Sequence, residues 1–106
     1  MIFVKDKNQA GRSDYYSDHR TLSEQFIVLG QAERLALLHI LNSEGEKKVS
    51  DLSKSIHTNM SSTSQHLRVL RDANFVTFRR EKAFVYYSLN RDAIVDFIEH
   101  ATSYIN

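Results

Sequence analysis

A short helix, a three-residue break and a second amphipathic helix follow one another in the middle of the chain, and this succession constrains the fold more than any other feature. The two helices are expected over residues 50–56 and 60–73, and the break between them is residues 57–59. Ser50 is the expected N-cap of the first helix. Inward-facing positions recur at the intervals of three and four residues that an α-helix requires: Leu52, Ile56, Thr63, Leu67 and Leu70. Two helices joined by so short a turn are typical of a helix-turn-helix.

A β-hairpin is expected after Asn74, where the hydrophobic period changes from about 3.6 residues to about 2. Asn tolerates the left-handed conformation in which many helices end. Residues 75–80 and 84–89 are rich in β-branched and aromatic side chains, and residues 79–83 make the expected turn. A hairpin directly after a helix-turn-helix forms a wing. The predicted fold is therefore mainly α with a small β-hairpin, a winged helix-turn-helix of about five helices and a two-stranded wing.

Three further helices complete this architecture. Residues 22–29 and 32–41 each place apolar side chains on one face, and Gly30 separates them. A polar link over residues 42–48 leads to the helix-turn-helix. The last helix is expected over residues 91–105, which again carry one apolar stripe.

The length of 106 residues is that of one domain. Residues 1–19 are polar and have no sustained apolar period, so they are expected to form a flexible N-terminal arm. Residues 20–106 are expected to form the winged helix-turn-helix domain for DNA binding and dimerisation. The apolar stretches are too short to cross a bilayer, so no membrane association is expected.

The composition excludes several classes of function. The chain has no cysteine, which rules out disulfides, thiolate metal sites and cysteine nucleophiles. It has no glycine-rich phosphate loop and no nucleophile elbow, so no enzymatic activity is expected. The missing cysteines are compatible with the cytoplasm, which is the expected location.

Positive charge is concentrated in the middle of the chain, although the whole chain carries a net charge of only +1. Residues 58–91 hold six Lys or Arg against two acidic residues, a net charge of +4. Residues 1–57 are neutral, and residues 92–106 carry a net charge of −3. A basic segment between neutral and acidic ends indicates a localised surface that faces a polyanion.

Consecutive motifs in this basic segment occur together in one known family. They are Ser62-Thr63-Ser64-Gln65-His66-Leu67, Leu70-Arg71-Asp72-Ala73-Asn74-Phe75-Val76, Arg79-Arg80-Glu81-Lys82 and Val85-Tyr86-Tyr87-Ser88-Leu89, with Leu29-Gly30-Gln31-Ala32-Glu33-Arg34-Leu35 upstream. Residues 22–105 thus resemble the ArsR/SmtB family of small bacterial winged-helix transcription factors. The resemblance implies a DNA-binding regulator.

The chain departs from the family pattern where that pattern carries sensing. Asn74 and Lys82 stand where the family usually has glycine. The first sensing motif of the family has two cysteines at the positions of Lys48 and Ser50, and the last helix lacks the family's metal-binding histidines. We therefore expect no bound metal, no cofactor and no metal or thiol sensing of the family's usual kind.

The second helix of the motif is expected to enter the major groove. Its exposed face has small hydroxyls for close approach, Gln65 is suited to adenine, and Arg68 is suited to guanine or phosphate. Cations on the wing reach phosphates or the minor groove, or alternatively guard an exposed strand edge against aggregation. Asn59 is expected to cap the helix as well. The residues expected to bind DNA are Asn59, Ser61, Ser62, Ser64, Gln65, Arg68, Arg71, Arg79, Arg80 and Lys82.

Three other polar side chains have more modest expected roles. His66 matches a family histidine but lies off the exposed face, so a packed structural role is favoured over base contact. Asp96 and His100 lie four residues apart on the last helix, within reach of one metal ion. A surface salt link between them is the favoured interpretation.

These observations predict a homodimeric transcriptional repressor that binds double-stranded DNA at an inverted repeat. The resemblance implies that the first and last helices form the dimer, which multiplies specificity by using two recognition helices. Two alternatives remain at this stage. One is a metal-responsive regulator with an atypical site at Asp96 and His100, and the other is a winged-helix module that binds proteins.

Overall fold

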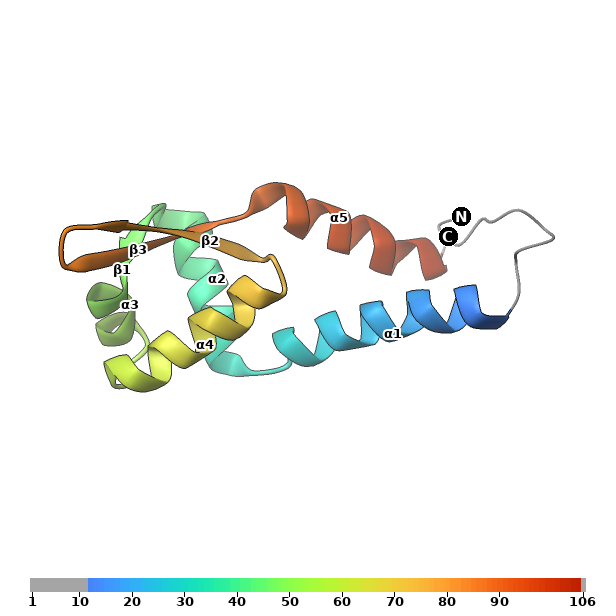
Figure 1. The fold of residues 1–106 in the computed structure, drawn as a ribbon, viewed down its shortest axis with the longest axis horizontal. Coiled ribbons are helices and arrows are strands. Elements are labelled where there is room, and N and C mark those ends of the chain that lie inside the picture. The colour runs from blue at the N-terminus through green and yellow to red at the C-terminus, as the bar shows by residue number, and fades with distance from the viewer. Residues whose placement is uncertain (1–11, 106) are drawn as a thin grey trace.

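The computed structural model describes residues 12–105, with the side chains of residues 19–104. The elements are α1 (Arg12–Leu29), α2 (Ala32–Glu44), β1 (Lys47–Lys48), α3 (Val49–Ser55), α4 (Met60–Asp72), β2 (Val76–Glu81), β3 (Phe84–Leu89), α5 (Arg91–Thr102) and a 3-10 turn (Ser103–Ile105). Figure 1 shows two parts: α2, α3, α4 and the sheet pack together, while α1 and α5 run side by side away from them. Within residues 12–105 no helix has the length and apolar character needed to span a membrane.

The helix-turn-helix is present as predicted. The turn between α3 and α4 contains His57, whose φ is 57°, and the amide of Thr58 donates to the carbonyl of Ser53 over 3.0 Å. The prediction that Ser50 caps α3 is wrong, because α3 already begins at Val49. Lys48 is the N-cap and makes no capping hydrogen bond through its side chain. Pairing of Lys48 in a strand fixes its extended backbone, so the helix begins one residue earlier.

The wing is confirmed as an antiparallel hairpin, with a third strand added. The strand order is β1-β3-β2, and the two residues of β1 pair with Tyr86 and Tyr87 of β3. β1 was not predicted from the sequence, because two residues are too few to show the alternating hydrophobic period of a strand. The turn is shorter than the expected residues 79–83, because β2 and β3 remain paired as far as Glu81 and Phe84. Lys82 has a φ of 56°, and this left-handed residue closes a two-residue turn.

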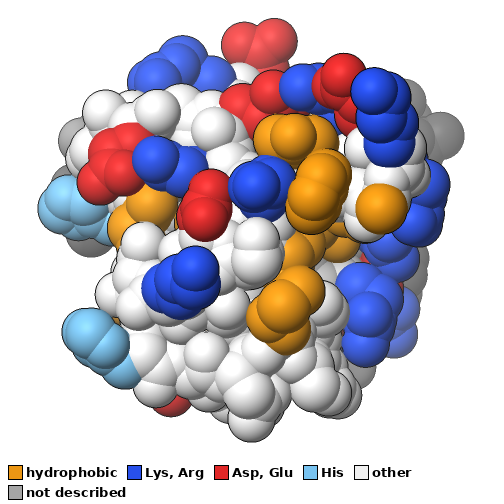
Figure 2. Space-filling model, turned by 90° about the vertical axis from the view of Figure 1, so that its left-hand side faces the viewer, with side chains coloured by type: hydrophobic (Ala, Val, Ile, Leu, Met, Phe, Trp, Pro, Cys, Tyr) orange, Lys and Arg blue, Asp and Glu red, His pale blue; other side chains and the backbone are white. Residues whose placement is uncertain are grey.

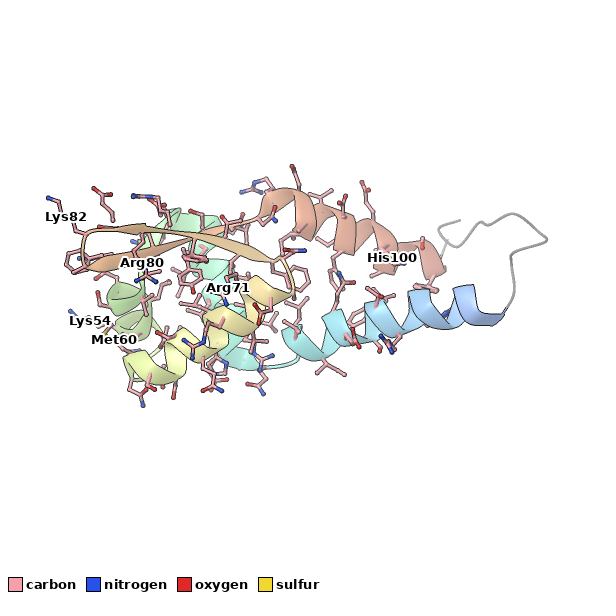
Figure 3. All side chains as sticks on the ribbon, viewed as in Figure 1. Lys54, Met60, Arg71, Arg80, Lys82 and His100 are labelled. Atoms are coloured by element: carbon pink, nitrogen blue, oxygen red, sulfur yellow. The ribbon has the colours of Figure 1, made fainter. Side chains whose placement is uncertain are left out.

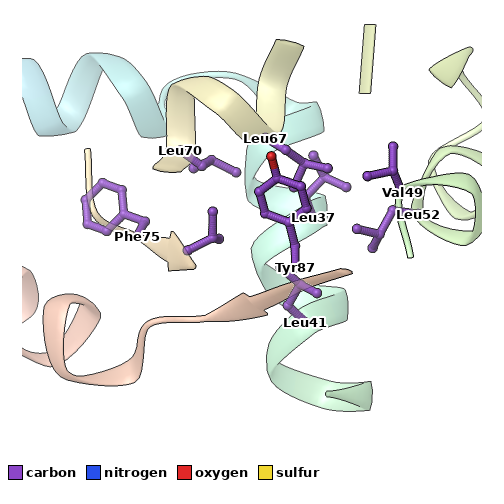
Figure 4. Close-up of a cluster of buried hydrophobic side chains, with 9 residues drawn as sticks. Leu37, Leu41, Val49, Leu52, Leu67, Leu70, Phe75 and Tyr87 are labelled. Carbon is purple, nitrogen blue, oxygen red and sulfur yellow. The ribbon is translucent and has the colours of Figure 1, made fainter. Parts of the chain in front are cut away.

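The core lies where α2, α3, α4 and the sheet meet (Figure 4). The inward faces predicted for the helix-turn-helix are confirmed at Thr63, Leu67 and Leu70, whose exposed fractions are all 0%. Asn74 has a φ of 70°, as expected for the residue that ends α4. The buried apolar cluster comprises Leu37, Leu41, Val49, Leu52, Leu67, Leu70, Phe75, Val76 and Tyr87. Burial of each such side chain contributes about 1.5–3 kcal/mol to folding, so this cluster fixes α4 and the base of the wing.

The first helix is longer than predicted. α1 begins at Arg12, so residues 12–19 of the expected arm are helical. Neither glycine nor proline interrupts the chain between Arg12 and Leu29, and the helix therefore continues past its apolar segment. The ring of His19 lies 5.5 Å from that of Tyr104, which joins α1 to the end of the chain. Residues 1–11 of the expected arm lie outside the described residues.

α1 and α5 are joined by aromatic contacts, yet they leave much apolar surface exposed. The ring of Phe97 contacts those of Phe26 and Phe75, with centroid distances of 5.2 and 5.6 Å. α5 has no fully buried residue. Large apolar side chains with exposed fractions of 42–71% lie on α1, on α5 and its 3-10 turn, and on the face of α2 beside α5: Phe26, Ile27, Leu35, Val95, Ile98 and Tyr104.

Candidate nucleic-acid interface

The exposed face of α4 carries the polar side chains that the sequence assigns to base contact. Ser61, Gln65 and Arg68 are exposed and Ser64 is half-buried, while Thr63 and its neighbours on the opposite face are buried. The helical repeat places these four residues on one continuous stripe. The stripe begins in the first turn of α4, whose free amides favour negative charge.

The start of α4 is fixed by Asn59. Its side-chain oxygen accepts a hydrogen bond from the amide of Ser62 over 2.7 Å, and its carbonyl accepts one from the hydroxyl of Thr63 over 2.9 Å. The predicted capping role of Asn59 is confirmed. Ser62 is half-buried beside this cap. Both residues therefore orient the helix end that carries the exposed stripe.

A cationic pocket lies between α4 and the wing. Its volume is about 170 Å³, and it is lined by Val49, Ser64, Arg68, Arg71, Phe78, Arg80, Val85 and Tyr87. The guanidinium of Arg71 lies 5.2 Å from the centre of the Phe78 ring and forms an exposed 3.4 Å ion pair with Asp72. Figure 3 shows Arg71 and Arg80 in the space between α4 and the hairpin. The structure thus brings together three cations that are separated in the sequence.

Two of these cations, and the lysine at the wing tip, have no carboxylate partner. Among the side chains of residues 19–104, no ion pair involves Arg68, Arg80 or Lys82. Figure 3 places Lys82 at the tip of the wing. Figure 2 views the end of the molecule formed by the wing, α3 and the start of α4, and basic side chains gather along its right-hand edge. This surface has the charge that a polyanion requires.

Arg79 is separate from the other predicted DNA-binding residues. Successive strand residues point to opposite faces, so Arg79 lies on the side of the wing away from Arg80. Its guanidinium binds both carboxylate oxygens of Glu46 and one of Glu81. The hydrogen bonds that Arg79 donates to Glu46 hold the pKa of the Glu46 carboxyl below its ordinary value of 4.5, and the same bonds raise the pKa of Arg79. Arg79 is therefore already neutralised within the protein.

Sequence reasoning missed two members of this region. Phe78 contributes the ring against which Arg71 packs, and its position two residues before Arg80 was a usable signal, since residues i and i+2 of a strand share a face. Glu46 begins the segment that corresponds to the family's first sensing motif, but it is 33 residues from Arg79, so no local signal pointed to the pairing of these two residues.

The remaining histidine and acidic candidates lie away from this surface. The Nδ1 atom of His66 accepts a hydrogen bond from the Nε of Arg34 over 3.3 Å, which confirms the structural role predicted for His66. The ring of His100 stacks on that of Tyr104, with centroids 6.3 Å apart. Among the side chains of residues 19–104, no three His, Cys, Asp or Glu come together in a way that could hold a metal ion.

Comparison with known proteins gives a consistent picture. Residues 32–77 match the family described as bacterial regulatory protein, arsR family. The chain is 31% identical to the arsenical resistance operon repressor of Bacillus subtilis over 71% of each chain. It is 30% identical to a CadC homolog of Staphylococcus aureus, a cadmium resistance transcriptional regulatory protein, over 76% of this chain and 66% of that relative.

Solved structures agree with these sequence matches. A protein described as a possible transcriptional regulator for arsenical resistance superposes with a TM-score of 0.70 at 33% identity, covering 76% of this chain and 83% of its own. NolR from Sinorhizobium fredii gives a TM-score of 0.72 at 26% identity, covering 85% of this chain and 89% of its own. The winged helix-turn-helix fold is therefore shared with solved transcriptional regulators.

Proposed function

This chain belongs to the arsR family of bacterial regulatory proteins, and from that premise we propose that it represses transcription as a homodimer bound to an inverted-repeat DNA operator. The observation that carries the proposal is the polar stripe of α4 beside three cations and the basic wing tip. Such a surface combines side chains that distinguish bases with charges that bind phosphates. The related repressors supply the expected sign of regulation.

In the proposed complex the first half of α4 enters the major groove. Gln65 pairs with adenine and Arg68 with guanine or a phosphate, while Ser61 and Ser64 allow close approach to the bases. Arg71, Arg80 and Lys82 contact phosphates on either side of the groove. Asn59 and Ser62 present the amides at the start of α4 to the backbone. The sequence also assigns Arg79 to DNA, but its two carboxylate partners favour a different role, which is argued below.

A second copy of the chain covers the apolar surface of α1 and α5 in this proposal. Exposed apolar patches of this kind on small proteins mark interaction surfaces. A groove of about 430 Å³ between α2 and α5 is lined mainly by aliphatic side chains, among them Leu35, Val95 and Ile98. A winged helix-turn-helix domain from Mycobacterium bovis, 20% identical to this chain, is described as homodimeric. Two-fold symmetry presents two copies of α4 to two half-sites.

The signal that controls the protein is proposed to differ from that of its metal-resistance relatives. Lys48 and Ser50 replace potential thiolate ligands, and an ammonium group repels a metal cation. We expect regulation by another ligand, by a partner protein or by the abundance of the repressor itself.

Selection of binding sites from random duplex DNA by the purified protein tests the proposal. The expected result is a two-fold symmetric consensus, bound by two chains per duplex in sedimentation measurements. Tenfold-reduced affinity after scrambling one half-site would support direct base recognition. Failure to enrich any sequence would contradict the operator-binding function and favour the protein-interaction alternative.

A further inference from the structure

The outer part of the wing has little hydrophobic anchorage. Val76 is the only buried residue of β2, and all the others in this strand are exposed. In β3, Tyr87 is the only fully buried residue, and Phe84 near the tip is 48% exposed. A two-stranded hairpin is marginally stable without packing on one face. The orientation of the wing must therefore depend strongly on its polar contacts.

Arg79 makes three short hydrogen bonds on the outer face of the wing. Its Nε and Nη2 atoms donate to the two carboxylate oxygens of Glu46 over 2.8 and 2.9 Å. Its Nη1 atom donates to Glu81 over 2.6 Å. The pair with Glu46 is bidentate, the geometry in which an arginine–carboxylate pair is strongest and most directional. Because both carboxylates are partly exposed, the gain in folding free energy is small, but the geometry is fixed.

These contacts cross the whole sheet. Glu46 directly precedes β1, Arg79 lies in β2, and β3 runs between the two strands. The guanidinium lies 4.5 Å above the ring of Tyr86, which is the direct cross-strand partner of Arg79. The hydroxyl of Ser88 donates a 3.4 Å hydrogen bond to Glu46. Side chains of β2 and β3 thus join the wing to Glu46, in the link between α2 and β1.

We propose that Glu46, Arg79 and Glu81 form a clamp that holds the wing at the angle at which Arg80 and Lys82 reach DNA. Arg79 is accordingly a positioning residue instead of a phosphate ligand. The inference rests on the proposed DNA-binding function. The distance from Val76 to Lys82 is about 20 Å along the strand, so a rotation of about 10° at the base displaces the tip by about 3.5 Å. A displacement of that size breaks a direct phosphate contact.

For the substitution Glu46→Gln, long-range electrostatics alone and the clamp predict opposite changes in DNA affinity. Glu46→Gln removes a negative charge from the DNA-binding half of the molecule, and long-range electrostatics then strengthens DNA binding. It also removes one of the two carboxylate partners of Arg79. If Arg79 is a phosphate ligand, this change strengthens its contact with DNA and steepens the dependence of affinity on salt. The clamp predicts weaker binding and a shallower salt dependence, because the loosened wing loses contacts.

Arg79→Lys provides an independent variant that keeps the positive charge. Lysine has no planar fork, so it cannot bind both oxygens of Glu46 and reach Glu81 at once. A phosphate ligand at position 79 tolerates this change, whereas a clamp does not. Glu44→Gln is the matched control, since Glu44 lies two residues before Glu46 and its ion pair is with Lys47 of β1 instead of with Arg79.

Fluorescence anisotropy with the selected operator, measured at several salt concentrations, tests the clamp. We expect Glu46→Gln and Arg79→Lys each to weaken binding about threefold to tenfold and to flatten the logarithmic salt slope by about one unit, as for loss of one phosphate contact. Glu44→Gln is expected to stay within about twofold of the wild type. Thermal unfolding of each variant, followed by circular dichroism, verifies that the fold is retained.

A nuclear magnetic resonance measurement adds a direct signature. The Nε–H signal of Arg79 is expected to be resolved and protected from exchange in the wild type, and to lose its protection in Glu46→Gln. Wild-type or higher affinity in either variant, with an unchanged or steeper salt slope, overturns the clamp.

A different result would contradict the proposed DNA-binding function. If Gln65→Ala and Arg80→Ala leave operator binding unchanged, the interface itself is wrong. If these two substitutions weaken binding while Glu46→Gln behaves like Glu44→Gln, only the clamp is wrong.

Discussion

The two ends of the molecule expose different kinds of side chain. At the wing and α4, most exposed side chains are cations and other polar groups above a well-packed core, together with Met60, Phe78 and Phe84, and Glu46 pairs with Arg79 of the wing. At α1 and α5, large apolar side chains such as Phe26, Ile27 and Ile98 are exposed among charged ones, and α5 buries no residue completely. The first surface is stable in water and suited to a charged ligand. Exposure of the second surface to water costs free energy, and this cost is removed when another apolar surface covers it.

This difference indicates which kind of partner binds at each end. Cations without carboxylate partners gain from contact with phosphates and gain nothing from an apolar partner. Exposed aliphatic and aromatic groups gain from burial against a like surface, as a second copy of the chain provides. In our account, DNA binding and self-association therefore occupy opposite ends of one small domain.

The largest expected effect comes from placing a charge on the apolar end. Ile98 is 50% exposed on α5, and Ile98→Glu is expected to convert the dimer into monomers because the carboxylate opposes burial. Operator affinity should fall by about 100-fold or more as the two half-sites lose their linkage. Sedimentation velocity and anisotropy measure both effects. Asp96→Lys, which changes the charge on the opposite face of α5 from Ile98, is the control.

Substitutions on α4 are expected to reduce sequence discrimination. Gln65→Ala and Arg68→Ala should each cost about 1–3 kcal/mol at one position of the half-site, with smaller losses on random DNA. Competition binding against operators with single base changes measures this cost. Equal losses on operator and random duplexes would show that both residues only position the helix.

A smaller effect is expected from removing the unpaired cations of the wing. Arg80→Ala and Lys82→Ala should weaken binding to all duplexes alike and flatten the logarithmic salt slope by about one unit each. Arg20→Ala, at the opposite end of the molecule on α1, is expected to leave the slope unchanged. An unaltered slope in both wing variants would mean that the wing does not contact DNA.

The smallest effect is expected from zinc. Among the described side chains of residues 19–104, neither end has a cluster of ligands suited to this metal. At about ten micromolar, zinc should change operator affinity by less than about tenfold, or about 1.4 kcal/mol of coupling. A hundredfold change that disappears in Asp96→Ala or His100→Ala would establish the metal-responsive alternative.

The elements that the sequence predicted correctly are those with a local signal. The period of α4, the left-handed Asn74 and the alternation of β2 and β3 are local signals, and each gave the right element. The helical continuation of α1 through residues 12–19 and the two-residue β1 have no such signal, and both were missed.

The site shows the same limit. The exposed stripe of α4 follows from helical spacing alone. The different roles of Arg79 and Arg80 do not follow from spacing. Arg79 is neutralised by Glu46, which is 33 residues away, while Arg80 lies beside α4. Sequence reasoning grouped these arginines by charge, and the structure separates them by face.

The separation of DNA binding and self-association between the two ends is tested most directly by nuclear magnetic resonance. Amide spectra of the labelled protein are recorded with and without one equivalent of operator duplex per dimer. We predict that the largest shifts occur in α4 and at the tip of the wing, with α1 and α5 nearly unchanged. Shifts centred on α1 and α5, with α4 unaffected, would contradict the account.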